Sequence, residues 1–349
     1  MKQLILCAFV IVTLCVSEIS RAQTVEYEFT NIVVDFRSRK EDLVGCAITG
    51  INDVGTMVGG CTDQNRNSAF RGFLYDGRKF KEIKIPRRLR DLNAAFAIET
   101  STVLALPGKS LFQSFGSQVS GNDATIASLV LDRTPPSPTP QDINNQDEVT
   151  GWYFDGTRIQ GFLWSRRRFR PKVEQLAFPN AALTEPTGLN DNGQVVGDYR
   201  GEDGLFHGFL YENGVFTTID PPFVPGEDSA ASGINNLGQI VGCYAPCLRG
   251  YFFDPDTSTF TSIDVPGAIL TQARDINDLG QIVGVYSDGI TSGGFLYDGG
   301  EFTLVHAPGA VDTTLFGINN DGAIVGAYVL ENAPGEFEHF AFVATAVEP

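Results

Sequence analysis

The chain has 349 residues, a net charge of −17 and 42% hydrophobic residues. This length allows one large domain, and 26 Phe against 2 Met suit a β core. The acidity disfavours nucleic acid and anionic lipid as partners, because both are themselves negatively charged.

The first 22 residues have the features of a signal peptide. Lys2 provides the positive start, an apolar run extends from Leu4 to Val16, and Ser20-Arg21-Ala22 is a small-x-small cleavage motif. The run is too short to span a bilayer, and no later segment is apolar enough to do so. We predict cleavage near Ala22 and secretion to the periplasm or the cell exterior. An uncleaved N-terminal helix is the alternative.

A short phrase recurs through the rest of the chain, and its clearest copy is GINNLGQIVG at residues 233–242. Asn235 can accept a hydrogen bond from the backbone two residues on, and Gly238 can adopt a left-handed conformation. These features predict a hairpin with a type I turn and a glycine bulge, in which Ile234 lies opposite Ile240. Gly242 leaves room for a neighbouring backbone or a large ring.

The spacing of the phrase predicts the number of repeats. Copies begin at residues 50, 142, 188, 233, 275 and 317. The gaps are 42 to 46 residues, except for a first gap of 92. Because this gap is twice a normal one, we predict a seventh, degenerate unit that begins near Phe96.

Each unit adds a run such as GFLY at 208–211 and another such as FTTIDP at 216–221. Four β-rich runs per unit, separated by turn residues, are typical of a propeller blade. We therefore predict an all-β fold, a seven-bladed β-propeller with four-stranded antiparallel blades, as one domain over residues 23–349. The last unit lacks its fourth strand. Segment 25–36 is expected to supply this strand and close the ring, which removes open sheet edges.

Four cysteines remain after signal removal, an even number in an exported chain. Cys46 and Cys61 lie on the two arms of the first hairpin, and Cys243 and Cys247 are close in sequence. We predict the disulfides Cys46–Cys61 and Cys243–Cys247, with free buried thiols as the alternative. The spacing does not match a zinc site.

The repeated GINNxGQIVG and GFLY phrases resemble the HAF-repeat family of bacterial extracellular proteins, from about Val44 to Val343. The resemblance implies secretion and a propeller-like fold, and it implies no agreed activity. Of the His-Ala/Gly-Phe triplets expected from the family name, only His207-Gly208-Phe209 fits. The corresponding positions elsewhere are occupied by other residues: Arg71, Gln160, Arg249 and Gly293.

No catalytic or metal-binding constellation is recognisable. Turns such as Asp278-Leu279-Gly280 resemble parts of calcium loops, but they lack the downstream bidentate acid. None of the three histidines has a ligand partner at strand or helix spacing, and no nucleophile or phosphate-loop motif occurs. We predict no catalytic residues, no metal and no cofactor.

Two other side-chain groups invite a binding hypothesis. An aromatic residue follows five of the six hairpins, and blade-to-blade packing is favoured over a sugar-binding surface because the strand parity of these residues matches that of the buried Ile. These aromatics are Trp152, Tyr199, Tyr244, Tyr286 and Tyr328. Basic clusters at 79–90 and 166–172 are interpreted as solvated loops, with an anion-binding patch as the alternative.

The leading hypothesis is a secreted binding or surface-interaction module, with carbohydrate as one candidate ligand. A glycan-active hydrolase or lyase with carboxylates on the loop-rich face, or a structural envelope protein, are the alternatives. Recognition is expected at the longer loops of the propeller. These loops cover residues 200–205, 221–230, 266–272, 308–314 and 330–338.

Overall fold

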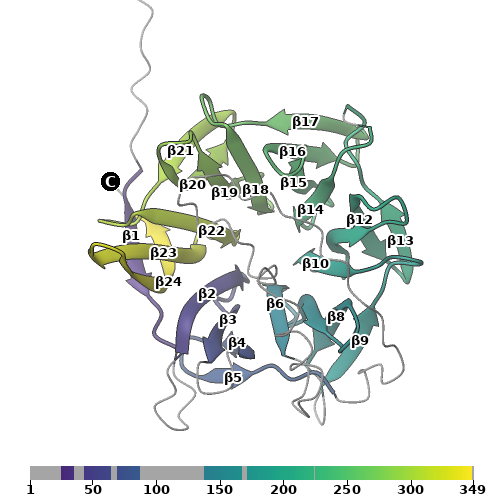
Figure 1. The fold of residues 1–349 in the computed structure, drawn as a ribbon, viewed down its shortest axis with the longest axis horizontal. Helices are drawn as coiled ribbons and strands as arrows, with labels where there is room; N and C mark the ends of the chain where they lie inside the picture. The colour runs from purple at the N-terminus through teal and green to yellow at the C-terminus, as the bar shows by residue number, and fades with distance from the viewer. Residues whose placement is uncertain are drawn as a thin grey trace, which may run out of the picture.

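The computed structural model of the protein describes residues 25–34, 43–63, 69–86, 137–166, 171–223 and 225–347. Within these ranges the chain forms 24 strands and no helix. The strands build six four-stranded antiparallel sheets, which surround a central axis as the blades of a propeller (Figure 1). The predicted signal peptide and the predicted unit near Phe96 lie outside the described residues.

Five blades are each made of four consecutive strands. Blade one contains β2 (Leu43–Ile51), β3 (Met57–Asp63), β4 (Ala69–Tyr75) and β5 (Phe80–Glu82). Blade two contains β6 (Pro138–Ile143), β7 (Val149–Phe154), β8 (Ile159–Ser165) and β9 (Lys172–Leu176). Blade three contains β10 (Thr184–Leu189), β11 (Val195–Arg200), β12 (Phe206–Glu212) and β13 (Val215–Thr218). Blade four contains β14 (Ser229–Ile234), β15 (Ile240–Tyr244), β16 (Arg249–Asp254) and β17 (Thr259–Ile263). Blade five contains β18 (Leu270–Ile276), β19 (Ile282–Ser287), β20 (Ser292–Asp298) and β21 (Glu301–Val305).

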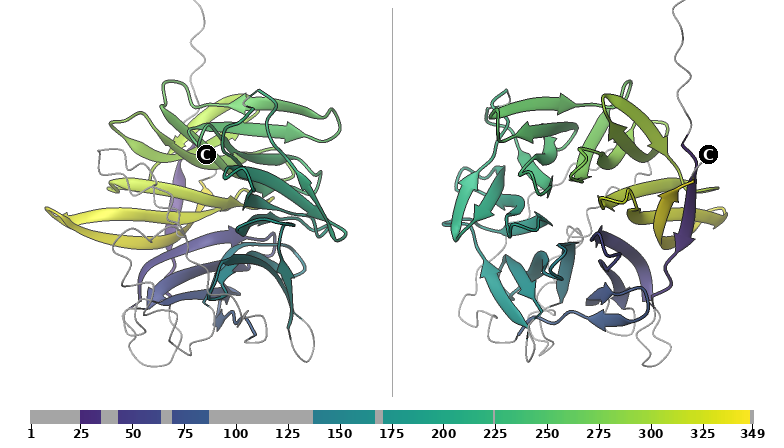
Figure 2. Two further views of the ribbon diagram at one scale, coloured as in Figure 1. Left: turned by 45° about the vertical axis from the view of Figure 1, so that its right-hand side comes forward. Right: turned by 180° about the vertical axis from the view of Figure 1, so that it is seen from behind.

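Blade six joins the two ends of the chain. Its strands β22 (Asp312–Ile318), β23 (Ile324–Ala333) and β24 (Glu336–Ala346) are followed in the sheet by β1 (Tyr27–Asn31). Phe29 pairs with Ala344, and its ring lies 4.9 Å from that of Phe342. Figure 2 shows the purple N-terminal strand beside the yellow C-terminal strands. The predicted closure by the N-terminal strand is confirmed.

The prediction of seven blades is wrong, because the ring already closes with six. Blade one contacts blade two directly, although 92 residues separate their hairpins. The Asn52 amide donates to the Asn144 carbonyl at 3.0 Å, and the Thr49 hydroxyl donates to the Pro140 carbonyl at 3.0 Å. No blade can stand between surfaces in such contact, so the chain between Pro86 and Ser137 adds no seventh blade between blades one and two.

The first asparagine of each hairpin forms a ladder around the axis. Its side-chain amide donates to the backbone carbonyl of the equivalent asparagine in the next blade at 2.9–3.2 Å. The six members, called here the asparagine ladder, are Asn52, Asn144, Asn190, Asn235, Asn277 and Asn319. All six are buried. Asn319 donates to Asn52 across 267 positions of sequence, which closes the circle.

The hairpin geometry follows the sequence prediction. Ile234 pairs with Ile240, and Gly238 has a φ of 76°. The Asn235 side-chain oxygen accepts hydrogen bonds from the backbone of Leu237 and of Gln239. The oxygen therefore shapes the turn while the amide of the same side chain holds the next blade.

A buried aromatic ring covers the last glycine of each phrase. Gly242 pairs with Tyr251, and a methyl group on Gly242 would collide with that ring and with the Ala230 carbonyl. The ring is fully buried in every blade, and its six members are Phe73, Phe162, Phe209, Tyr251, Phe295 and Phe342. Glycine is required here because only hydrogen fits beneath the ring.

The topology gives the propeller two different ends. The hairpin between the first and second strand of every blade lies on one end, called here the turn face. The loops from second to third strand, and from the fourth strand to the next blade, lie on the other end, called here the loop-rich face. The turn face is thus formed around the axis by near-identical hairpins, with the turns from third to fourth strand at its outer edge. The loop-rich face carries the connections from second to third strand and from blade to blade, which differ among blades.

Replacing Phe29 by Ala tests the closure of the ring. The ring of Phe29 is half-buried against blade six, so its loss should lower the free energy of unfolding by roughly 1–2 kcal/mol. Urea unfolding measures the change. Val33→Ala is the matched control, because Val33 is 81% exposed. An equal effect of both variants would contradict closure by β1.

Candidate functional site

A second ring of side chains closes the turn face. Each residue that follows a ladder asparagine is alternately Asp or Asn: Asp53, Asn145, Asp191, Asn236, Asp278 and Asn320. Each of these Asn amides donates to the Oδ2 atoms of both neighbouring aspartates at 2.8–3.2 Å. Each side-chain Oδ1 accepts a backbone N–H from the adjacent blade at 2.7–2.9 Å. The alternation separates the three negative charges by neutral donors.

Two further aspartates line a cavity of about 60 Å³ at the centre of these rings. Asp142 accepts backbone N–H groups of Ile143 at 2.7 Å and of Leu189 at 2.8 Å. Asp275 likewise accepts N–H groups of Ile276 at 2.8 Å and of Ile318 at 2.9 Å. Each aspartate therefore links its own blade to the next, and this cavity is part of the scaffold.

Burial shapes the titration of both groups. It raises the pKa of Asp142 to about 7, with a smaller contribution from the charge of Asp191. Burial and then the charge of Asp142 raise the pKa of Asp275 well above its usual range. The backbone hydrogen bonds oppose these shifts without cancelling them.

Both predicted disulfides are confirmed. Cys46 is bonded to Cys61 across the first hairpin, and Cys243 is bonded to Cys247. The second bond holds a loop on the loop-rich face, and this loop is also fastened to blade five. The Gln272 amide donates to the Cys247 carbonyl at 2.8 Å, and the Thr271 N–H donates to the Leu248 carbonyl at 3.0 Å.

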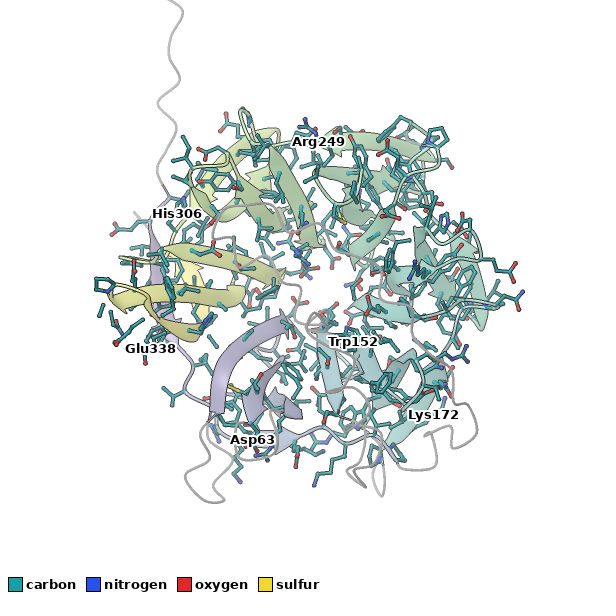
Figure 3. All side chains as sticks on the ribbon, in the orientation of Figure 1. Asp63, Trp152, Lys172, Arg249, His306 and Glu338 are labelled. Carbon is teal, nitrogen blue, oxygen red and sulfur yellow. A yellow bond between two sulfur atoms is a disulfide. The ribbon has the colours of Figure 1, made fainter. Side chains whose placement is uncertain are left out.

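The aromatics that follow the hairpins pack between blades, as predicted. Tyr199, Tyr244, Tyr286 and Tyr328 are buried. Their hydroxyls bond to Thr218, Ser262, His306 and Asn31 respectively. In blade two this position belongs to Tyr153, so the assignment of Trp152 was out of register by one residue. Trp152 is half-buried and lies toward the inner side of its blade (Figure 3).

Three members of the two basic clusters meet between blades one and two. Lys79, Lys81 and Arg166 line a cavity of about 290 Å³. Lys81 lies 5.1 Å from the ring centre of Trp164, and Arg166 forms an ion pair with Asp147 at 3.4 Å. Asp76 also lines the cavity, so acidic groups offset the positive charge there, and most of the Arg residues lie outside the described residues.

The loop-rich face carries a polar network where blade three meets blade four. His207 Nδ1 lies 2.7 Å from Asp220, and Nε2 lies 3.1 Å from Asp203. Burial opposes protonation, but hydrogen bonds and charges from both aspartates raise the pKa of His207. Asp220 also accepts bonds from the Ser229 hydroxyl at 2.6 Å and from the Gly208 N–H at 3.1 Å.

Two carboxylates lie beside this network on the inner strands of blade three. Glu185 of β10 is directly opposite Asp198 of β11, so both side chains project from the same face of the sheet. Val196, two residues before Asp198, packs with Tyr251 of blade four. Strand alternation therefore turns both carboxylates toward blade four. We call Glu185, Asp198 and Tyr251 the acid niche.

Burial raises the pKa of Glu185 to about 7. It also raises the pKa of Asp198 well above its usual range, with further contributions from the charges of Glu185 and Asp228. Sequence reasoning missed this pair because acidic residues are abundant. A signal did exist, since Tyr251 replaces the Phe that the other five blades place over the glycine.

A metal site and a membrane-spanning helix can be looked for in the part of the chain that the structure describes. There, no group of three or more His, Cys, Asp or Glu side chains is placed to hold a metal ion. The same residues include no helix with the length and apolar character needed to cross a membrane.

Comparisons with known proteins concern the fold. No family model and no curated protein sequence matches the chain. The virginiamycin B lyase structure from Staphylococcus aureus has 11% identity and a TM-score of 0.41, covering 93% of this chain and 89% of that one. TolB from Acinetobacter baumannii has 11% identity and a TM-score of 0.47, covering 85% of this chain and 63% of that one. A mutant Aleuria aurantia lectin in complex with Fucalpha1-6GlcNAc has 11% identity and a TM-score of 0.45, covering 88% of this chain and 97% of that one. Similarities of this size carry no argument about a ligand or an activity.

The aspartates of the central cavity should make stability depend on pH. The folded pKa of Asp142, about 7, lies above the unfolded value of about 3.9. This contribution to stability is therefore complete below the unfolded pKa and is lost as pH rises through about 7. Asp142→Asn should reduce the loss of stability between about pH 5 and about pH 8 by on the order of 2 kcal/mol.

Thermal unfolding across this pH range measures the effect. Asp256→Asn is the control, because Asp256 is exposed on the β16–β17 turn. An unchanged pH dependence in Asp142→Asn would show that the raised pKa is wrongly assigned.

Proposed function

We propose that the protein is an exported binding module whose loop-rich face docks a protein partner that presents basic and apolar side chains. The repeated scaffold supports a binding role, because its six blades hold loops of different length and composition on one face. Of the alternatives considered from the sequence, this one accounts best for the residues exposed there.

Exposed apolar side chains form an arc on this face over blades four, five and six. Each lies in a loop or at a loop end: Phe223, Leu248, Ile269, Ile290, Val311 and Phe337. Ile290 is 94% exposed. We call this set the apolar arc, and it is the single observation that carries the proposal. Exposed apolar side chains gathered on one face are typical of an interaction site.

The loops that carry the apolar arc are firmly held. The Ile269 N–H donates to the Ser287 carbonyl and the Val311 N–H donates to the Val329 carbonyl, both at 2.8 Å. Phe223 contacts the ring of Tyr244 at 5.1 Å. A face that is ordered before binding loses less conformational entropy when a partner docks.

Acidic residues accompany the apolar arc. Glu227 follows Phe223 in the same loop, Asp288 precedes Ile290, and Glu336 and Glu338 flank Phe337. Glu338 lies on the outlying β23–β24 hairpin (Figure 3). With a net charge of −17, the protein attracts positively charged partners. A basic amphipathic segment, with Lys or Arg beside apolar side chains, matches both features.

Two alternatives receive less support from the geometry. The tyrosines that the sequence offers for a sugar-stacking surface are buried between blades. A glycan-active enzyme needs two carboxyls on either side of a sugar, whereas Glu185 and Asp198 are side by side on one sheet face with Tyr251 packed against it.

Export is supported by the two disulfides, which are typical of oxidising compartments.

A short fluorescent peptide composed of Lys and Leu should bind the protein, and a matched Glu and Leu peptide should not. Ile269→Ser combined with Ile290→Ser should weaken binding roughly tenfold, because contacts with two apolar side chains are lost. Fluorescence anisotropy measures the affinity.

Leu237→Ser combined with Leu279→Ser is the matched control, because these leucines are exposed on the turn face. Equal loss in both double variants would contradict docking at the loop-rich face, since general electrostatic attraction does not distinguish the two ends.

A further inference from the structure

The acid niche is unique among the six blades. The positions equivalent to Glu185 and Asp198 form a facing pair in every blade, one step from the pair that contains the covered glycine. In the other blades these pairs are Ala47–Gly60, Thr139–Trp152, Ala230–Cys243, Gln272–Val285 and Thr314–Ala327. None of them contains a carboxylate. The repeated scaffold therefore folds without these two acids, and folding alone does not explain their presence.

Tyr251 adds an independent observation at the same place. The five equivalent residues are phenylalanines, so its hydroxyl is the only addition that blade four makes at this position. The residue is fully buried, and its hydroxyl has no hydrogen-bond partner among the described residues. Burial and then the charges of Asp220 and Asp198 raise its pKa, and Tyr251 packs with Val196, which shares a sheet face with Asp198. A buried hydroxyl without a partner costs free energy.

The carboxylates of the niche also lack donors. No hydrogen bond or ion pair reaches the side chain of Glu185 or of Asp198 among the described residues, and both are half-buried. His207 is already engaged by Asp203 and Asp220. Buried charge is normally paired with an opposite charge, so the niche has acceptors for a cation that none of the described residues supplies.

The chemistry of the niche selects the kind of cation. Among the described residues no group of three or more His, Cys, Asp or Glu side chains is placed to hold a metal ion, and two acids and a phenol fall short of the six to eight oxygen ligands of a calcium site. An ammonium group has three N–H donors, which matches two carboxylates and one phenol oxygen.

We infer that Glu185, Asp198 and Tyr251 form a binding site for one primary ammonium group, supplied by a lysine side chain of the docked partner. The source of the amine rests on the proposed function, whereas the site itself does not. Glu185 and Asp198 accept two of the N–H donors, and the Tyr251 oxygen accepts the third.

The ionisable groups around the site define how binding depends on pH. They come from the strands of blade three, from the connection between blades three and four, and from β16: Glu185, Asp198, Asp203, His207, Asp220, Asp228 and Tyr251. A carboxylate must lose its proton to accept an ammonium group, and burial raises the pKa of Glu185 to about 7. Binding of the ammonium group should therefore strengthen as pH rises through about 7, because Glu185 loses its proton in this range.

The test uses Nα-acetyl-lysine methylamide as the probe and the norleucine analogue, which lacks the ammonium group, as its control. Binding to the full chain is measured by NMR titration. Wild-type protein should bind the lysine probe and not the norleucine probe. Glu185→Gln combined with Asp198→Asn should weaken binding at least tenfold, and Tyr251→Phe should weaken it several-fold.

Asp256→Asn combined with Glu301→Gln removes the same charge from exposed positions on the turn face and should change the affinity less than about twofold. The Glu185/Asp198 double variant should also be more stable than wild type at about pH 8, because two unpaired buried charges are gone. This second readout shows that the variant is folded when its binding is measured.

The outcomes separate this inference from the proposed function. If the lysine probe fails to bind, or if the two double variants lose affinity equally, the ammonium site is refuted. If the Lys and Leu peptide binds and the Glu185/Asp198 variant leaves its affinity unchanged, the site is refuted while docking on the loop-rich face stands. If the lysine probe binds at the niche and the peptide does not, the ammonium site stands and the docking partner is wrong.

Discussion

The fold depends on one side chain used for two purposes, the first asparagine of each hairpin. Its oxygen closes the turn of its own blade, and its amide donates to the carbonyl of the next blade. Only a side chain with an acceptor and a donor on one short stem can do both. The turn of each blade and the contact with the next blade are therefore coupled at six buried asparagines. The ring can close only if the backbone carbonyl of each of these asparagines lies at the same level along the propeller axis.

This coupling separates the molecule into a uniform end and a variable end. On the turn face, the members of the asparagine ladder and of the ring of alternating Asp and Asn form hydrogen bonds from blade to blade. Few of their polar atoms are therefore left to bind a ligand. On the loop-rich face, the strands end without such a constraint, and chain segments of different composition are tolerated. The acid niche and the apolar arc both occur there, on a scaffold whose rigidity comes from the opposite end.

The niche shows that a repeat can change buried residues between two blades without losing its fold. Blade three carries two acids at positions where the other blades carry residues without charge. Blade four has a tyrosine at the buried aromatic position that is a phenylalanine in the other five blades. Each change is small, and each is unfavourable by itself because burial raises the proton affinity of Glu185 and Asp198. Their coincidence between two adjacent blades distinguishes a site from scattered variation.

The sequence alone determined the blade and its parts. Asn-Asn-x-Gly specifies the hairpin turn, and the last glycine of the phrase marks the position that the buried aromatic ring covers. Period-two alternation specifies the buried face of each strand. These signals can be read from the sequence because each acts over a few residues. Closure by segment 25–36 and the two disulfides were also predictable, since a missing strand and paired cysteines leave a local trace. The number of blades was decided only by tertiary contact. A gap of twice the repeat length is consistent with seven blades or with six, and the bonds Asn52–Asn144 and Thr49–Pro140 between blades one and two distinguish these two cases. The acid niche likewise arises from register and from packing between blades, which bring Glu185, Asp198 and Tyr251 together although no short-range pattern connects them.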